Sequence, residues 1–303
     1  MLSIIIVSWN TAQLLDNCLS SILANPPTLP FETWVVDNAS TDDSPRMVCE
    51  KYPQVHLVEN RQNVGFAGAN NQAIQNCTGK YILLLNPDTL VAPGALQALI
   101  DFLDKHPEAG AVGARIIRPD GTLQISSHPR PTLSRELWRL FHLDTLSPYA
   151  MYPLAKWETN QPQEVDILAG ACLLVRKEVL EQIGYLDEDF FMYAEEIDLC
   201  HRMQRAGWRL YWTPQAEVVH LGGQSTQQVP TEMFLNLYGS NIKYFRKHHG
   251  LVTAQVYKLI LCIAAVSRLI LAPFALLGHA SHRQKRLTLV NRYWRLILSL
   301  AGM

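Results

Sequence analysis

The sequence predicts an α/β fold: a mostly parallel central sheet with helices on both faces, followed by a helical C-terminal region. Short apolar, β-branched runs alternate with helix-like segments in the first third of the chain, the pattern of a parallel sheet covered on both sides. The last fifth of the chain is apolar and basic, and it lacks strand signals. With 303 residues, 48% hydrophobic and 17% charged, the chain is large enough for a sizeable core.

Each early element has its own local signal. We expect strands in the runs IIIVSW, TWVVDN, VHLVEN and YILLLN, and helices around 14–23, 44–51 and 67–75 between them. A helix at 95–105 and a strand at 111–117 follow, and Pro-Asp-Gly at 119–121 indicates a turn.

The middle of the chain is less regular. The stretch from 128 to 164 contains five prolines, and we expect it to be irregular: a loop on the acceptor side of a site, or an insertion without a catalytic role. Order returns with VDILAGACLLVRKEVLEQIG, which predicts a strand and a helix. FFMYAEEIDLCHRMQRAGW then predicts an amphipathic helix ended by Gly207. No internal repeat appears.

Charge is distributed unevenly although the formal net charge is only -1. The last acidic residue is Glu232, and the segment after it carries ten Lys or Arg. The overall charge gives no reason to expect nucleic-acid binding. Its uneven distribution predicts an acidic body and a basic tail.

The tail predicts membrane association. Residues 259–277 are apolar except for Arg268, and as a helix they would be about 28 Å long, close to the thickness of the hydrocarbon layer. A central arginine costs roughly 2.5–3.5 kcal/mol on insertion, and Pro273 would kink a span, so an in-plane helix competes with a crossing one. The basic, amphipathic segment at 282–300 suits an anionic membrane surface, a partner or the protein body.

The cysteines and the N-terminus bear on location. Six cysteines without a CxxC pair fit a reducing compartment, and the opening MLSIIIVSWN resembles a buried strand more than a signal peptide. We expect a cytoplasmic body with peripheral or single-pass association at the cytoplasmic face of the membrane.

Three predicted strands end in polar residues, which are Asn10, Asp37 with Asn38, and Asn86 with Asp88. Because ligands of such sheets bind at the carboxyl ends of the strands, we expect these ends to share one crevice. Asp88 ends a wholly apolar strand and could supply a carboxylate to a divalent metal that neutralises a leaving diphosphate. Asn-Pro-Asp is equally an ordinary turn, so the motif alone leaves both interpretations open.

Transfer of a sugar from such a diphosphate to an acceptor hydroxyl also needs a base that takes the hydroxyl's proton. Glu195, Glu196 and Asp198 cluster at a helix start, where Asp198 is expected to pair with Arg202 four residues on. His220 precedes two glycines and is a candidate metal or diphosphate ligand, or a buried structural histidine. Asp37 suits a ribose or base contact or a turn cap, and Gly65 allows a nucleotide to approach the backbone.

Taken together, these segments resemble the inverting nucleotide-sugar glycosyltransferases of family 2, particularly their rhamnosyltransferase-like members. The ordered motifs, from about residue 2 to 225, are IIIVSWN, VVDNASTDDS, ENRQNVGFAGANN, YILLLNPDT, GACLLVRKEV, GYLDEDFFMYAEEIDLCHR and VVHLGGQS. The resemblance implies a GT-A fold for residues 1–232, with a basic, hydrophobic helical region at 233–303. It also implies a Mg or Mn cofactor, and it favours dTDP-rhamnose as the donor.

The resemblance assigns roles residue by residue. Asp88 takes the metal position with His220, although Asn86 replaces the first acid of the family's DXD-like motif. The family's acidic pair usually reads Glu-Asp, whereas here it is Glu195-Glu196. Its second member is the usual base, so Glu196 is the expected base. The expected nucleotide-sugar-binding residues are Asn10, Asp37, Asn38, Asn63, Gly65, Asn70, Asn86 and Gly170.

The implied reaction is metal-assisted single displacement with inversion, from a nucleoside-diphosphate sugar to a glycan or polyprenyl-diphosphate-linked acceptor. No GxGxxG follows the first strand and no P-loop motif occurs, which disfavours dinucleotide and P-loop enzymes. The alternative is a non-catalytic nucleotide-sugar-binding or membrane scaffold protein, which would be expected to lack the metal aspartate or the base.

Overall fold

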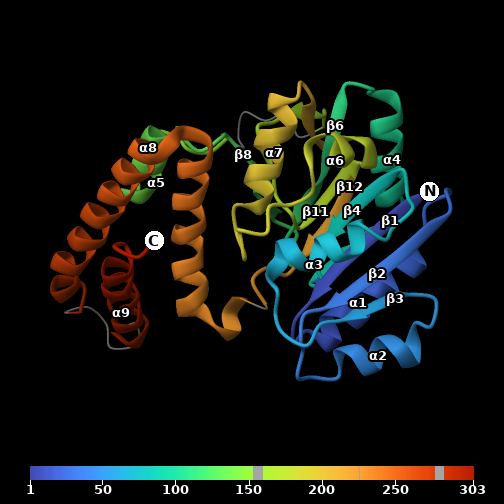
Figure 1. The fold of residues 1–303 in the computed structure, drawn as a ribbon, viewed down its shortest axis with the longest axis horizontal. Coiled ribbons are helices and arrows are strands. Elements are labelled where there is room, and N and C mark those ends of the chain that lie inside the picture. Colours follow the sequence, from blue (N-terminus) through green and yellow to red (C-terminus); the bar gives the residue numbers. More distant parts are fainter. Residues whose placement is uncertain (153–159, 225, 277–282) are drawn as a thin grey trace. The chain divides into compact units, whose positions relative to one another are not determined.

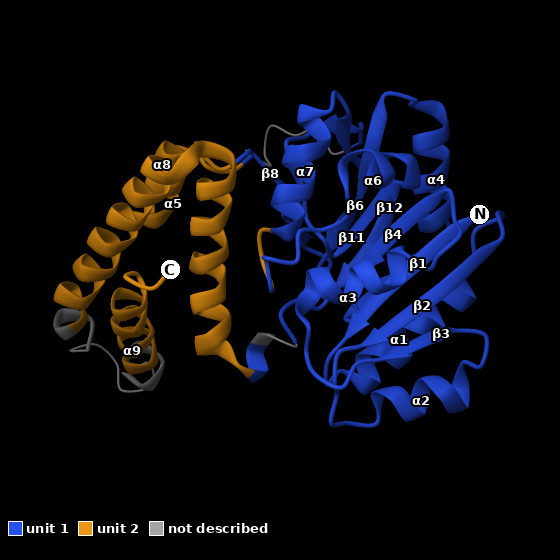
Figure 2. Ribbon diagram, in the orientation of Figure 1, with its two compact units in different colours: residues 1–130, 152–191, 195–228 blue, residues 131–151, 192–194, 229–303 orange. Residues whose placement is uncertain are grey.

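The structure is a computed structural model that describes residues 1–152, 160–224, 226–276 and 283–303. Part of the proline-rich stretch, the last residue of VVHLGGQS and the end of the 259–277 run lie outside the described residues. The chain forms two compact units, coloured separately in Figure 2. Unit 1 contains residues 1–130, 152–191 and 195–228, and unit 2 contains residues 131–151, 192–194 and 229–303.

Unit 1 is built on one ten-stranded sheet, whose main path runs β3-β2-β1-β4-β11-β6-β12-β5. β1, β2, β3 and β4 are parallel to one another, whereas β11 runs antiparallel to both β4 and β6. The strands are β1 (Leu2–Ser8), β2 (Phe31–Asp37), β3 (His56–Glu59), β4 (Tyr81–Leu85), β5 (Thr89–Val91), β6 (Ala109–Ile117), β7 (Leu123–Gln124), β9 (Gln163–Glu164), β11 (Cys172–Arg176) and β12 (Arg209–His220). A separate pair joins β8 (Ser127–His128) to β10 (Ile167–Leu168).

Helices cover both faces of this sheet (Figure 1). Ile4 and Ile6 of β1 belong to the core cluster that includes Leu15 of α1 and Leu99 of α4. Ile5, which is also fully buried, points to the opposite face, where α3 packs on β1, because side chains alternate along a strand. The helices of unit 1 are α1 (Ala12–Ala24), α2 (Ser44–Lys51), α3 (Gly65–Ile74), α4 (Ala95–Lys105), α6 (Lys177–Ile183) and α7 (Glu195–Arg205).

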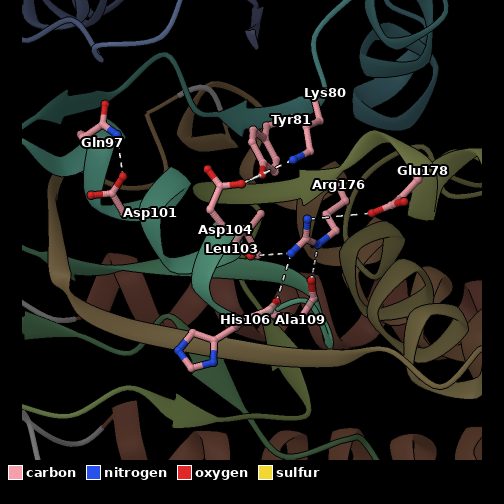
Figure 3. A network of polar contacts seen from close by, with 10 residues as sticks. All are labelled: Lys80, Tyr81, Gln97, Asp101, Leu103, Asp104, His106, Ala109, Arg176 and Glu178. Carbon is pink, nitrogen blue, oxygen red and sulfur yellow. Dashed lines mark hydrogen bonds and ion pairs between the residues drawn. The ribbon is translucent and has the colours of Figure 1, made fainter.

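Arg176, the last residue of β11, ties the sheet to the end of α4 (Figure 3). Its guanidinium donates to the carbonyl oxygens of Leu103 and His106 at the helix end and to that of Ala109 at the start of β6. The last carbonyls of a helix have no partner within the helix, so a buried cation at this position satisfies several at once.

Unit 2 is helical. It contains α5 (Leu133–Leu140), a short 3-10 turn at Leu143–Thr145, α8 (Pro230–Leu276) and α9 (Arg283–Ser299). α8 is interrupted at Gly250, whose φ of +85° and ψ of 171° are not helical. By length and composition, α8 is a candidate membrane-crossing helix over Pro230–Ala272.

The expectation that 128–164 is irregular is wrong for α5. The side-chain oxygen of Thr132 accepts a hydrogen bond from the Arg135 amide and caps the helix. Within unit 2, Glu136 is buried and accepts hydrogen bonds from Arg139 and from the Tyr257 hydroxyl on α8. The prolines that suggested a loop lie on either side of this helix and not inside it.

Arg268, which interrupts the apolar run of α8, is satisfied inside unit 2. Its guanidinium donates to the carbonyl oxygens of Ala264 and of Leu140, the last residue of α5. The same group lies 5.1 Å from the ring centroid of Tyr293 on α9. This arginine therefore connects α5, α8 and α9.

Candidate functional site

The topology brings several strand ends to one edge of the sheet. Ser8 of β1 is paired with Asp37 of β2, and Ile6 is paired with Leu85 of β4, so these parallel strands end side by side. β11 is antiparallel, so it begins at the same edge. The Asn86 amide donates to the Ala171 carbonyl oxygen at 3.1 Å, which places Gly170 beside the Asn-Pro-Asp segment.

Asp37 is almost fully buried at this edge, with 2% of its surface exposed. One carboxylate oxygen accepts a 2.9 Å hydrogen bond from the Ser40 amide, while the other is buried without a hydrogen-bond partner in the described protein. Burying an unsatisfied carboxylate oxygen is costly, so this atom is placed for a ligand's donor.

Asn38 holds the loop that leads into α3. Its side-chain amide donates to Asn63 Oδ1 at 2.8 Å and to the Gly65 carbonyl at 3.1 Å, and its own Oδ1 accepts from the Val64 amide at 3.0 Å. Asn38 and Asn63 therefore shape the entry to α3, through a bond to each other and bonds to the backbone of Val64 and Gly65.

Gly65 begins α3 with φ +82°, and a Cβ atom there would lie 2.5 Å from the carbonyl oxygen of Phe191. Only glycine allows this approach, which is completed by a 2.8 Å hydrogen bond from the Phe66 amide to the same oxygen.

Asn10 and Asn70 are also engaged by the protein. Asn10 has φ +51°, and its Oδ1 accepts from the Thr41 amide at 2.7 Å. The Asn70 side chain donates to the Phe66 carbonyl one turn earlier in α3 at 2.8 Å. Their contact with a nucleotide stays a prediction.

Asn86, Asp88 and His220 lie together in one cluster, in which Asp88 and His220 are buried. His220 ends β12 and is paired with Thr89 of β5, and the Leu221 amide donates to the Asp88 carbonyl at 3.0 Å. His220 Nε2 lies 3.2 Å from Asp88 Oδ1 and 3.4 Å from Asn86 Nδ2. Asp88 and His220 are 6% and 8% exposed, so little water competes for them.

This donor set fits a divalent metal. A carboxylate oxygen suits Mg²⁺ and Mn²⁺, and a neutral imidazole nitrogen beside it is an acceptable ligand for Mn²⁺. Within the described ranges, no group of three or more His, Cys, Asp or Glu side chains is arranged to hold a metal by itself. A cavity of about 200 Å³ opens beside Asp88, lined mainly by apolar residues that include Leu14, Leu90 and Val219.

Glu195 and Glu196 start α7, after two residues, Tyr193 and Ala194, with positive φ. Each glutamate has one buried carboxyl oxygen without a hydrogen-bond partner in the described structure. Burial and the neighbouring charge of Glu196 raise the pKa of Glu195 well above its usual value, and burial also raises the pKa of Glu196. Two adjacent carboxyls with unsatisfied oxygens are therefore poised to exchange a proton with a ligand.

Gly170 places Glu196 close to the strand edge. A Cβ atom at Gly170 would lie 4.0 Å from Glu196 Cβ and 3.8 Å from the Phe66 ring. Glu196 therefore lies beside the segment that starts β11, whose Ala171 is hydrogen-bonded to Asn86.

The predicted pair of Asp198 and Arg202 is confirmed, and it anchors α7. Arg202 Nε donates to the fully buried Asp198 carboxylate at 2.7 Å, and its other nitrogens donate to the carbonyls of Ile183, Gly184 and Tyr185. Asp198 therefore has a structural role. Glu195 and Glu196 are the acids of the helix that have an oxygen left to bind a ligand.

Sequence reasoning missed Gln124. This residue of β7 places its Oε1 3.3 Å from His220 Nδ1, and no sequence signal distinguishes it from other polar residues after the Pro-Asp-Gly turn.

Comparison with known proteins adds the family. The profile of Glycosyl transferase family 2 matches residues 3–184. The chain is 31% identical, over 82% of its length and 85% of the relative's, to the N-acetylglucosaminyl-diphospho-decaprenol L-rhamnosyltransferase of Mycobacterium tuberculosis. It is 27% identical to a low-salt glycan biosynthesis hexosyltransferase of Haloferax volcanii, over 78% of this chain and 72% of that one.

Solved structures share the fold. A mannosyltransferase from Pyrobaculum calidifontis, solved with GDP-Man and Mn²⁺, matches with a TM-score of 0.60 and 19% identity, covering 99% of this chain and 86% of that one. The structure of GalNAc-T7 with UDP, GalNAc and Mn²⁺ matches with a TM-score of 0.56 and 16% identity, covering 73% and 43%.

Proposed function

The chain belongs to glycosyl transferase family 2, and from this premise we propose that it transfers L-rhamnose from a nucleoside diphosphate to a polyprenyl-diphosphate-linked glycan. That the protein is a GT-A glycosyltransferase using a nucleotide-sugar donor follows from the family and its named relatives. The choice of rhamnose and of a lipid-linked acceptor is supported by the mycobacterial rhamnosyltransferase, whose name gives both.

One observation carries the mechanism: Glu196, which has a buried carboxyl oxygen without a partner among the described residues, lies beside Gly170, next to the strand edge that bears Asn86, Asp88 and His220. A sugar transferase needs a base for the acceptor and a charged group for the leaving diphosphate, and this edge offers both.

Glu196 acts as the base. Its carboxylate takes the proton of the acceptor hydroxyl while that oxygen forms a bond to the anomeric carbon, and the bond from this carbon to the donor phosphate oxygen breaks on the opposite side. The nucleoside diphosphate leaves with the electron pair, and the configuration inverts. Burial raises the pKa of Glu196 toward that of a stronger base, which favours proton transfer near neutral pH.

Asp88 and His220 are the residues that would hold a Mg²⁺ or Mn²⁺ ion. When bound, this ion supplies positive charge that stabilises the departing diphosphate. Asn86 has no charge to contribute, and its amide nitrogen lies 3.4 Å from His220 Nε2, so it helps to orient the histidine.

Asp37 serves the nucleoside. Its unpartnered, buried carboxylate oxygen can accept a hydrogen bond from a base N–H or a ribose hydroxyl. Asn38, Asn63 and Gly65 keep the adjoining loop in shape, and their predicted binding role is then indirect.

The test is release of nucleoside diphosphate by purified protein from a panel of nucleotide sugars with Mg²⁺ or Mn²⁺. We expect dTDP-rhamnose to be used best, and Glu196→Gln to lower turnover by about 10²–10⁴ while thermal stability persists. Glu181→Gln, an exposed acid on α6, is the matched control and should act as wild type. Full activity of Glu196→Gln would remove the base assignment.

Unit 2 supports a location at the membrane. After Gly250, α8 exposes an apolar stripe with a spacing of three and four residues, and no carboxylate occurs beyond Glu232. Such a surface, with its basic residues, fits an anionic bilayer better than an acid-rich soluble partner. The stripe consists of Val252, Val256, Leu259, Ile263, Val266 and Ile270.

We place this helix in the plane of the cytoplasmic membrane surface and not across it. Arg268 ties the helix to the Leu140 carbonyl of α5, a helix whose sequence, LSRELWRL, is too polar to enter the hydrocarbon layer. In-plane insertion keeps this bond and still buries the stripe.

Vesicle sedimentation tests this placement. The protein should pellet with phosphatidylglycerol vesicles and be released by alkaline carbonate, and Leu259→Glu with Ile263→Glu should leave it in the supernatant. Leu23→Glu, an exposed leucine on α1, is the control that should still bind. Resistance to carbonate would indicate a crossing helix. Unchanged binding of the double variant would refute the role of the stripe in membrane binding.

A further inference from the structure

His220 has a neighbour on each of its ring nitrogens. Nε2 faces Asp88 Oδ1 at 3.2 Å and Asn86 Nδ2 at 3.4 Å, and Nδ1 faces Gln124 Oε1 at 3.3 Å. The histidine is 8% exposed and Gln124 is half-buried, so these neighbours and not bulk water determine the tautomer of the ring.

The sheet register explains why Gln124 reaches this position. Ile116 of β6 is paired with Gln124 of β7 on one side and with Val218 of β12 on the other. Directly paired residues project from the same face, and residues two apart on a strand do as well. Gln124 and His220 therefore project from one face, across a single intervening strand.

We propose that Gln124 is a positioning residue that holds His220 in the tautomer able to bind the metal; this rests on the metal role of His220 in the proposed function. A side-chain carbonyl oxygen only accepts hydrogen bonds, so the Nδ1 atom that faces it carries the hydrogen. In the neutral ring the lone pair then lies on Nε2, the nitrogen that faces Asp88.

Asn86 favours the same tautomer independently. Its Nδ2 atom is a donor, and a donor 3.4 Å from Nε2 is matched by a lone pair on that nitrogen. Nε2 and Asp88 Oδ1 are then two acceptors 3.2 Å apart, which repel each other until a cation lies between them. The cluster is thus arranged to take a metal ion. Gln124 is the partner that fixes the tautomer and the orientation of the histidine ligand.

Binding of Mn²⁺ in the presence of nucleoside diphosphate, followed by the electron paramagnetic resonance of the free ion, tests this role without catalysis. We expect Gln124→Leu to raise the Kd for Mn²⁺ by about 10- to 100-fold, the usual effect of losing such a partner. Gln124→Glu keeps an accepting oxygen and should stay within about threefold of wild type. Gln182→Leu, which removes an acceptor from the Trp208 ring N–H elsewhere in unit 1, is the matched control.

A second measurement reads the tautomer of the wild-type ring directly. Long-range ¹⁵N–¹H spectra of histidine-labelled wild type, assigned with His220→Gln, should show the His220 hydrogen on Nδ1. A hydrogen on Nε2, or an unchanged Mn²⁺ affinity in Gln124→Leu, would overturn the proposal. If His220→Gln also binds Mn²⁺ as wild type does, the metal role of His220 itself fails, which separates the two hypotheses.

Discussion

Asp88 Oδ1 lies 3.2 Å from His220 Nε2, although one residue follows the fourth strand and the other ends the twelfth. Because Asp88 is the one acid of the Asn-Pro-Asp segment, its charge should dominate metal binding. Asp88→Asn keeps the shape and removes the charge, so we expect a loss of about 3 kcal/mol, or roughly 100-fold, in both Mn²⁺ affinity and turnover. Asp120→Asn, in the exposed turn before β7, should leave both unchanged.

The raised pKa of Glu195 predicts how stability depends on pH. The folded protein holds this proton more tightly than the unfolded chain does, whose glutamate titrates near 4.5. Stability is therefore lost as the pH rises above about 4.5 toward the raised folded pKa. Glu195→Gln removes this loss, so its melting temperature should exceed that of wild type at pH 7.5 by at least about 2 °C, and the two should converge near pH 4. An equal difference at both pH values would contradict the assignment.

The pair of Asp198 and Arg202 should contribute strongly to stability. Arg202→Met leaves a fully buried carboxylate without its cation and three carbonyls without a donor, so we expect unfolding free energy to fall by about 3–5 kcal/mol. Arg46→Met breaks an exposed pair with Asp43 and should cost less than about 1 kcal/mol. Urea denaturation of both variants checks the contrast, which fails if the two losses are equal.

Gly65 should tolerate no side chain. Gly65→Ala combines a positive φ with a Cβ atom 2.5 Å from the Phe191 carbonyl, so we expect a loss of about 2–4 kcal/mol and lower donor affinity. Gly121 has nearly the same φ, +81°, but nothing within 4 Å of a Cβ, and Gly121→Ala should cost only about 1 kcal/mol. Comparing the two melting curves isolates the steric part, and similar losses would contradict it.

The local signals of the sequence were sufficient for most elements of unit 1. The helices at Ser44–Lys51 and Ala95–Lys105 begin and end where the pattern predicts, because their apolar spacing matches the helical period. The two- and three-residue strands β5, β7, β8 and β9 and the helix α5 were missed. A strand that short has no recognisable period, and the prolines around α5 obscured its cap at Thr132.

The sequence identified the main residues of the candidate site but not the contacts that each of them makes. Ordered motifs named Asp37, Asp88, Glu195, Glu196 and His220, because the residue types and their positions at strand and helix ends are visible in one dimension. That Asn38 and Asn63 hold a loop, and that Arg202 pairs with Asp198 and donates to the 183–185 carbonyls, depends on which groups face each other.

By itself, the sequence determined the fold class, the family and the chemical groups of the site, since periodicity, strand-end polarity and motif order are properties of the chain. Only the tertiary structure decided which acids keep an unsatisfied oxygen, that Arg268 is paired inside unit 2, and that Gln124 faces His220. The physical reason is that burial, hydrogen-bond satisfaction and the state of an imidazole ring depend on neighbours from distant strands and helices, which the order of residues does not reveal.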